Sequence, residues 1–237
     1  MEEPGEAYFG GVLSAGSVIR IVAMKALLMS AVVLFGVSPV MLAQMAVPPS
    51  GATAFRDTSM LKPPSGVKLA IVEFEDLECF ACAQASPIVH AAMEQYGIPR
   101  VHHDFLIHGH AWSRMAAIEA RYLEDTVSPQ VAEEFRRDVF ANQPGIAGPD
   151  DLQRFTAVWF QRHHVAMPFV LDGSGRCAKE VDADCNLGLR LGVRHTPTIV
   201  VVTPTRWIEV TDPRQLYAAI DMAKESLRTP VTTKKRN

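Results

Sequence analysis

The chain has 237 residues, of which 48% are hydrophobic, and its formal net charge is −3. This length allows one sizeable core and leaves room for an inserted subdomain. A charge so close to neutral does not indicate a nucleic-acid partner, and we predict none.

Residues 24–44 are typical of a secretory signal peptide. Lys25 is followed by an apolar run at 26–37, and Pro39 precedes the Ala43-Gln44 pair. The apolar run is shorter than the ~18 residues that a membrane span needs. We therefore predict that the chain is exported to the periplasm or another extracytoplasmic compartment.

Two features leave alternatives open at this end of the chain. Met41 stands where signal cleavage favours a small residue, so an uncleaved membrane anchor that runs on to about Val47 is the alternative. Three glutamates lie among the first six residues, where a signal peptide is normally basic, which indicates that translation starts at Met24. We predict a leader over residues 1–43.

Residues 44–66 contain four prolines and predict an extended linker. In chain order, the sequence then predicts a strand at 67–74, a helix at 79–96, a strand at 100–107, helices at 111–123, 129–140 and 150–164, strands at 198–203 and, at a sheet edge, 206–210, and a helix at 213–227. This order predicts an α/β domain over 67–227 with a helical insertion at about 110–190, followed by a polar tail at 228–237.

Cys79 and Cys82 form a CxxC pair directly behind a predicted buried strand, at the start of a predicted helix. The first thiol then lies at the helix N-terminus, where the positive end of the helix dipole stabilises a thiolate. The second thiol lies one turn further along, close enough to form a disulfide. This arrangement is typical of a dithiol that exchanges electrons with the cysteines of another protein.

Half of a zinc site is the alternative, because CxxC spacing also suits that metal. Such a site needs a second ligand pair, but seven residues separate Cys177 from Cys185. The four histidines between residues 102 and 110 have no carboxylate or cysteine at a spacing that completes a ligand set. We therefore predict a redox pair, with no metal ion and no other cofactor.

The segment 72–82 resembles the active-site segment of the thioredoxin superfamily, and the segment 194–198 resembles its cis-proline loop. The helical block between them is similar to the domain that DsbA-like proteins insert into the thioredoxin fold. Residues 104–106 also resemble that branch, although Leu106 stands where a proline is frequent. The resemblance covers about residues 67–225 and implies a thioredoxin-like fold with an inserted helical domain.

This resemblance implies that Cys79 is the nucleophile and Cys82 the resolving thiol of a redox disulfide. It also places Glu73 at the buried acidic position of thioredoxin-like proteins, six residues before Cys79. A carboxylate there can exchange the proton of Cys82. The alternative is a solvent-facing glutamate on an edge strand, because Glu75 on the same face is also acidic.

Glu75, Asp76 and Glu78 lie close to Cys79 in the sequence. Their negative charge is expected to oppose formation of the thiolate, so a strongly oxidising disulfide does not follow from the sequence alone. The simpler interpretation of these carboxylates is an ordinary solvated turn.

The Thr196-Pro197 bond is predicted to be cis, because the cis form costs little free energy only before a proline. A trans proline at the start of a strand is the alternative. A cis bond turns the backbone of Thr196 toward Cys79, where an extended substrate can pair with it as an added strand. His195 is a further candidate for contacting substrate or tuning the thiolate, although a lone loop histidine is more often incidental.

Cys177 and Cys185 predict a structural disulfide that closes a short loop. A second redox pair and two unpaired thiols are the alternatives.

Together these features predict an exported thiol–disulfide oxidoreductase, most simply an oxidase that forms disulfides in other exported proteins. Substrate proteins with thiols or disulfides are the expected partners, and the resemblance implies a quinone-linked membrane partner that reoxidises the pair. The chain is expected to be a monomer. The linker at 44–66 is too short for the dimerisation domain of DsbC-type isomerases, which favours an oxidase over an isomerase of that type. The alternatives are a disulfide reductase or isomerase and, in another class, a non-catalytic binding or metal-chaperone module on the same scaffold.

Overall fold

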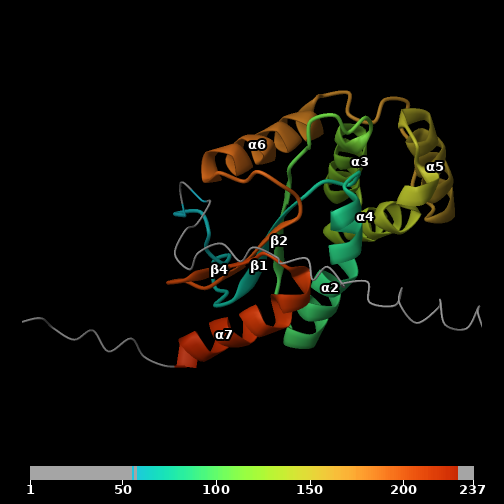
Figure 1. The fold of residues 1–237 in the computed structure, drawn as a ribbon. Helices are drawn as coiled ribbons and strands as arrows, with labels where there is room; N and C mark the ends of the chain where they lie inside the picture. Colours follow the sequence, from blue (N-terminus) through green and yellow to red (C-terminus); the bar gives the residue numbers. More distant parts are fainter. Residues whose placement is uncertain (1–54, 56–57, 229–237) are drawn as a thin grey trace, which may run out of the picture. The chain divides into compact units, whose positions relative to one another are not determined.

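The computed structural model describes Phe55 and residues 58–228. The strands of its sheet are β1 (Ala70–Glu75), β2 (Arg100–Asp104), β3 (Thr198–Val202) and β4 (Trp207–Val210), in the order β2-β1-β3-β4. β1 and β2 are parallel, whereas β3 runs antiparallel to both of its neighbours (Figure 1). β4 lies at an edge of the sheet, as predicted.

The helices are α2 (Phe80–Tyr96), α3 (Ser113–Thr126), α4 (Pro129–Asn142), α5 (Pro149–Arg162), α6 (Arg176–Leu191) and α7 (Leu216–Arg228). Short 3-10 turns at Gln143–Gly145 and Pro213–Gln215 precede α5 and α7. α3, α4 and α5 begin and end within a few residues of the predicted boundaries. The predicted leader, most of the linker and nearly all of the tail lie outside the described residues and stay predictions.

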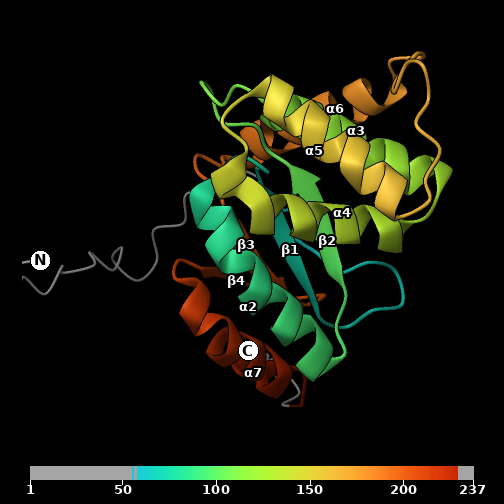
Figure 2. The same ribbon diagram turned by 90° about the vertical axis from the view of Figure 1, so that its right-hand side faces the viewer.

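Helices cover both faces of the sheet (Figures 1 and 2). α2 and α7 pack on one face, where side chains such as Val89 and Ile220 meet Ile199 of β3. On the opposite face, α6 and the segment before β1 cover Phe74 and Phe105. These layers place the start of α2 at the end of the central strand β1.

The segment before β1 joins the core at residues that the sequence assigns to the linker. Phe55 is 7% exposed and its ring lies 5.3 Å from that of Trp207, edge to face. Leu61 is also buried in the same cluster. Part of the predicted linker therefore belongs to the core, because these two apolar side chains close over β1, β3 and β4.

A third apolar cluster fills the helical insertion. Its members include Phe135 of α4 and Trp159 of α5, whose rings lie 5.1 Å apart. Leu77 and Cys82 belong to the same cluster. The CxxC segment therefore contributes to the core of the inserted helices.

α6 is where the structure departs most from the sequence prediction. Cys177 and Cys185 both lie in this one helix, and both thiols are free. Eight residues along an α-helix place two Cα atoms about 12 Å apart along the axis. A disulfide needs a Cα–Cα distance of about 4.4–6.8 Å. The predicted structural disulfide and the loop that it would close are therefore wrong.

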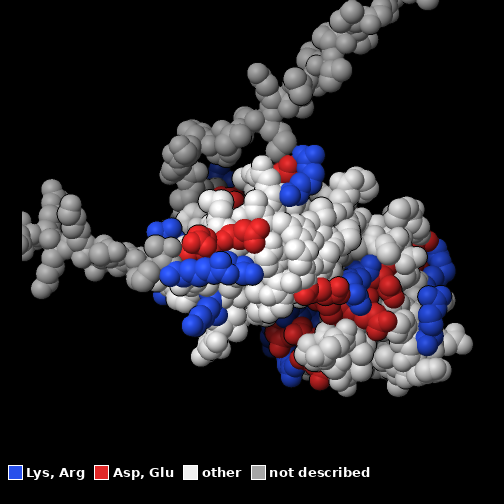
Figure 3. Space-filling model, turned by 90° about the horizontal axis from the view of Figure 1, so that it is seen from below, with Lys and Arg blue, Asp and Glu red and all other residues white. Residues whose placement is uncertain are grey.

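Charge is mixed on one face of the domain (Figure 3). Acidic and basic side chains lie next to one another on the face shown in Figure 3. Among the residues that the structure describes, none of the helices combines the length and the apolar character needed to cross a bilayer.

Candidate active site

The CxxC pair lies where β1 ends and α2 begins. Cys79 is the N-cap residue of α2 and has extended backbone angles, so it stands beside the first backbone N–H groups of the helix. Its thiol is half-buried and donates a hydrogen bond to the Thr196 carbonyl at 3.4 Å. Cys82, one turn further along, is 1% exposed. The two thiols therefore differ in access to a partner protein.

They also differ in acidity. Hydrogen bonding from the Cys82 thiol, assisted by the Thr196 side chain and the backbone N–H groups of residues 81 and 82, outweighs burial and lowers the pKa of Cys79 to about 5. Burial raises the pKa of Cys82, and the neighbouring Cys79 and Glu75 raise it further. At neutral pH this arrangement favours a thiolate on Cys79 and a protonated thiol on Cys82. The three nearby carboxylates do not prevent the Cys79 thiolate.

The loop before β3 faces the CxxC pair. The Thr196-Pro197 bond is cis, which confirms the prediction. Thr196 contacts Cys79 through its carbonyl, whereas His195 is exposed and its ring nitrogen Nδ1 lies 3.2 Å from the Pro197 carbonyl oxygen. A cavity of about 540 Å³ opens beside this loop and is lined on the other side by residues of α2 such as Ile88.

Asp76 and Glu78 bind the active-site turn to the start of the helical insertion. The Asp76 carboxylate accepts a hydrogen bond from the backbone N–H of Ile107 at 2.7 Å and lies 2.8 Å from Nδ1 of His110. The Glu78 carboxylate accepts hydrogen bonds from two backbone N–H groups at the N-terminus of α3, at 2.7 and 3.0 Å. Helix N-termini leave such donors unpaired. An ordinary solvated turn is therefore the wrong interpretation of these two residues.

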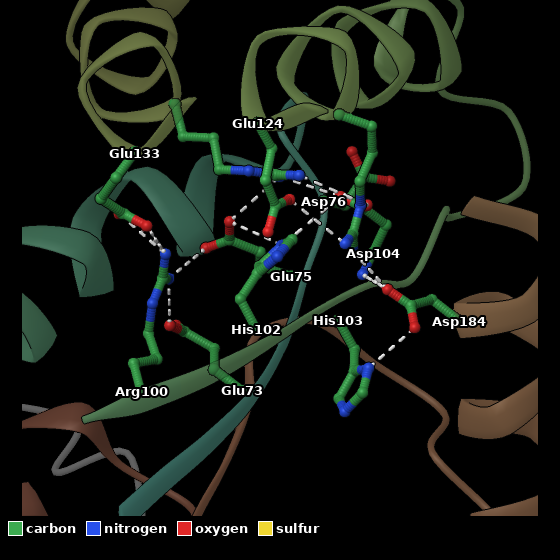
Figure 4. A network of polar contacts seen from close by, with 12 residues as sticks. Glu73, Glu75, Asp76, Arg100, His102, His103, Asp104, Glu124, Glu133 and Asp184 are labelled. Atoms are coloured by element: carbon green, nitrogen blue, oxygen red, sulfur yellow. Dashed lines mark hydrogen bonds and ion pairs between the residues drawn. The ribbon is translucent and has the colours of Figure 1, made fainter. Parts of the chain in front are cut away.

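A network of buried charges occupies the sheet face beneath α2 and α4 (Figure 4). The register of β1 and β2 pairs Glu73 with His102 and Glu75 with Asp104, so all four side chains emerge on one face. The ion pairs of this network also include Arg100, Arg121, Glu133, Arg136 and Asp184.

Glu73 is fully buried on the central strand β1, so the solvent-facing alternative is wrong. Its Oε2 accepts a hydrogen bond from Nη1 of Arg100 at 2.7 Å. Burial raises the pKa of Glu73 despite the opposing charge of Arg100. Its Oε1 has no hydrogen-bond partner among the described residues. A buried carboxyl group of raised pKa takes up a proton readily.

Glu75 has a larger part in the site than the sequence predicts. Its carboxylate lies 3.1 Å from Nη1 of Arg100 and 3.2 Å from Nε2 of His102. Burial raises the pKa of Glu75, but the charges of Arg100 and His102 outweigh burial and lower it to about 2. Of the two glutamates, Glu75 is the one whose charge acts more strongly on Cys82.

Sequence reasoning missed the cations of this network. Arg100 Nη1 contacts both glutamates of β1, and its Nη2 lies 2.7 Å from Glu133 of α4. Arg136, also on α4, lies 2.8 Å from Asp104. The polar side chains at every second position of β2 were the available signal, since period two indicates a shared face. Burial of that face by α2 and α4 could not be read from the strand alone.

Three of the four histidines of the 102–110 segment contact carboxylates, and His102 does so through Glu75. His103 pairs with Asp184 at 2.8 Å, and His110 pairs with Asp76. Among the described residues, no group of His, Cys, Asp and Glu side chains has a geometry that could hold a metal ion.

Comparison with solved structures identifies the fold. The chain is similar to the thiol-disulfide exchange protein alpha-DsbA2 of Wolbachia pipientis, with a TM-score of 0.54 and 16% identity over 68% of this chain and 84% of that one. It is also similar to BdbD of Bacillus subtilis, with a TM-score of 0.55 and 18% identity over 71% of this chain and 92% of that one. A periplasmic thioredoxin-like protein of Salmonella enterica serovar Typhimurium gives a TM-score of 0.52 and 16% identity over 68% of this chain and 87% of that one.

No family model matches the chain, and no curated protein matches it in sequence. The structural similarity shows a DsbA-like thioredoxin fold with a helical insertion, as predicted.

Proposed function

We propose that this chain is an exported thiol–disulfide oxidoreductase that works as an oxidase through Cys79 and Cys82. The difference in acidity between the two thiols carries the proposal. A thiolate on Cys79 stabilises the reduced pair, and a stable reduced pair makes the corresponding disulfide a stronger oxidant.

In the oxidising reaction, a substrate thiolate attacks Sγ of Cys79 in the Cys79–Cys82 disulfide. The bond to Cys82 breaks, and Cys82 leaves as a thiolate that takes up a proton. A second substrate thiolate then attacks the substrate sulfur of the mixed disulfide, and Cys79 leaves as a thiolate. The substrate loses two electrons and gains a disulfide, while the CxxC pair gains two electrons.

Glu73 is the proposed proton donor for Cys82 in the first step and the acceptor in the reverse direction. Its buried position and raised pKa support this role. Ionised Glu75 assists by raising the pKa of Cys82, which keeps that sulfur protonated after the exchange.

Thr196 and Pro197 are the proposed substrate contacts, with His195 at the exposed rim. The Thr196 carbonyl oxygen lies 3.4 Å from the Cys79 sulfur, so a chain bound alongside it would bring a cysteine close to the reactive sulfur. The adjacent cavity of about 540 Å³ offers room for neighbouring side chains of a substrate.

Export rests on the signal-like residues 24–44 and on the periplasmic Salmonella protein to which the fold is similar. In that compartment the reduced pair must pass two electrons to an acceptor, for which we propose a membrane redox partner. We further propose that the chain acts as a monomer.

The reduction potential of Cys79–Cys82 in the full chain, equilibrated against glutathione, tests the direction of the reaction. A value toward about −120 mV supports the oxidase, whereas a value near about −270 mV contradicts it and indicates a reductase. A Cys79→Ser variant that retains full activity in cells would overturn the enzyme proposal and favour a binding module. Cys185→Ser, which removes a thiol outside the CxxC pair, is the matched control.

A further inference from the structure

Glu119 of α3 is a buried carboxylate that the proposed thiol chemistry does not use. It is 4% exposed, and its Oε2 accepts a hydrogen bond from the Thr156 hydroxyl of α5 at 2.7 Å. Among the described residues, this hydroxyl is its one hydrogen-bond or ion-pair partner. Carboxylates are rarely buried without a cation, because removal from water costs several kcal/mol.

A cavity of about 360 Å³ opens next to Glu119. Its walls come from α3, α5 and residues 167–171, and most of them are apolar: Met115, Ile118, Ala157, Met167, Pro168, Phe169 and Leu171. Gln153 and Thr156 are the other polar side chains of the lining. This volume lies in the range of small-molecule sites, which are mostly apolar with a few converging polar groups.

The rim of the cavity is open and apolar. Phe169 is fully exposed and Met167 is 46% exposed. Large apolar side chains at the opening of a cavity that also contains polar groups are typical of a binding site for an amphiphilic ligand. None of the lining residues belongs to the CxxC site or to the loop that faces it.

The charge of Glu119 sets the chemistry of the ligand. The Thr156 hydroxyl that contacts its carboxylate is neutral, and so are the other side chains that line the cavity: Gln153 from α5 and apolar side chains from α3, α5 and residues 167–171. Burial raises the pKa of Glu119 to about 7, because no cation among the described residues compensates for the lost water. A ligand that brings its own positive charge would supply the missing partner.

We propose that the cavity between α3, α5 and residues 167–171 binds a small organic cation, with its ammonium group paired to Glu119 and its apolar body against Phe169 and Met167.

Calorimetric titration of the full chain with 2-phenylethylamine tests the proposal, with 2-phenylethanol as the uncharged counterpart of similar shape. The amine should bind saturably and about tenfold or more tightly than the alcohol, which is the contribution of one hydrogen bond to a charged group. Its affinity should rise between pH about 6 and about 8, because Glu119 loses its proton there while the amine stays protonated. Affinity for the alcohol should not follow that rise.

Glu119→Gln keeps the side-chain shape and removes the charge, so it should abolish the preference for the amine. Glu94→Gln, which changes an exposed glutamate of α2, should leave the preference intact. Phe169→Ala changes a fully exposed side chain, so it should fold normally and weaken both ligands. Equal binding of the two ligands, no binding of the amine, or an unchanged preference in Glu119→Gln would each overturn the proposal.

Discussion

The reactivity of this site is set by two sulfur atoms that are one helical turn apart but lie in different surroundings. Cys79 meets backbone N–H groups at the helix N-terminus, the Cys82 thiol and the Thr196 side chain, all of which stabilise negative charge. Cys82 meets the apolar core of the inserted helices and the charge of Glu75, both of which oppose it. Position along one turn of α2 is therefore enough to separate a thiol of lowered pKa, the proposed nucleophile, from a thiol of raised pKa, the proposed resolving thiol.

The acidity of Cys79 can be measured directly. The ultraviolet absorbance of its thiolate should titrate with a midpoint at about pH 5 in the reduced chain. Cys82→Ser should raise this midpoint, because the Cys82 thiol is the main hydrogen-bond donor to Cys79 and a serine hydroxyl replaces only part of its contribution. Cys185→Ser should leave it unchanged. A midpoint close to the ordinary value of about 8.5 would contradict the assigned hydrogen bonds.

Glu119 gives the stability a pH dependence opposite to that of an ion-paired acid. The unfolded chain loses this proton near pH 4.5, whereas the folded chain keeps it until about pH 7. The folded state therefore binds more protons in this window, and the free energy of unfolding falls as the pH rises through it.

Glu119→Gln should remove this fall in the free energy of unfolding, and Glu94→Gln should leave it unchanged. Urea unfolding at both ends of the window measures the difference. A Glu119→Gln variant whose pH dependence equals that of the original chain would contradict the buried, unpaired state of Glu119.

At the scale of elements, the sheet is joined to the helices through charge as well as through apolar contact. Arg100 of β2 links both glutamates of β1 to Glu133 of α4, and Arg136 of α4 links back to Asp104 of β2. These ion pairs connect three elements, β1, β2 and α4. Loss of one partner leaves the remaining charges buried without compensation.

Arg100→Met tests this dependence, because it keeps an unbranched apolar stem and removes the charge. We expect a loss of about 3–5 kcal/mol in the free energy of unfolding, the range for breaking a buried ion pair by removing one partner. Arg154→Met is the control, since the Arg154 side chain is 71% exposed and pairs with Asp151 on the surface. Its effect should stay below about 1 kcal/mol. Equal losses in the two variants would show that the network contributes little.

α6 approaches the sheet closely at Gly188. A Cβ atom at this position would lie 2.7 Å from Cε2 of Phe105 and 3.3 Å from Cδ1 of Phe74. Gly188→Ala should therefore lower the free energy of unfolding by about 1–3 kcal/mol through overpacking, as measured by denaturant unfolding. At the exposed Gly173 the nearest atom is 3.8 Å away, so Gly173→Ala should have little effect. A Gly188→Ala variant as stable as the control would mean that α6 can shift without cost.

The limits of sequence reasoning also lie at this scale. Periodicity and punctuation by proline and glycine predicted α3, α4 and α5 and all the strands, because those signals are local. α6 was missed as one helix because two cysteines suggested a closed loop, whereas the helix keeps them apart. The CxxC pair and the cis bond follow from short motifs. The burial of Glu75 and Arg100 cannot be predicted from such motifs, since it depends on which helices cover the sheet.

At the scale of the whole molecule, three apolar clusters are joined at the CxxC segment. β1 and the start of α2 take part in all three, through Phe74, Ala85 and Cys82. Asp76 and Glu78 add polar links from the same turn to residues 107–113. The CxxC pair is thus held by both the sheet and the insertion.

The four cysteines allow a count of the thiols in the whole chain. When the CxxC pair is oxidised and the chain is then unfolded without reductant, a maleimide should label two thiols, those of Cys177 and Cys185. Their positions in one helix keep them from pairing with each other. Cys177→Ser should reduce the count by one. If no thiol of the oxidised, unfolded chain were labelled, Cys177 and Cys185 would be paired in a disulfide, which would contradict the structure.

The ion pairs that Arg100 makes with both the sheet and the insertion have a consequence for how the two parts can evolve. The acids that neutralise this guanidinium come from the sheet and from the insertion, and Asp104 likewise takes its counter-charges from α3 and α4. A chimera that received its inserted helices from another protein of this fold would bring foreign side chains to those positions. Unless they matched in sign, buried charges of the recipient sheet would face one another unpaired. Substitutions on β2 and on α4 are therefore expected to accumulate in compensating pairs, so that sheet and insertion are inherited as one unit.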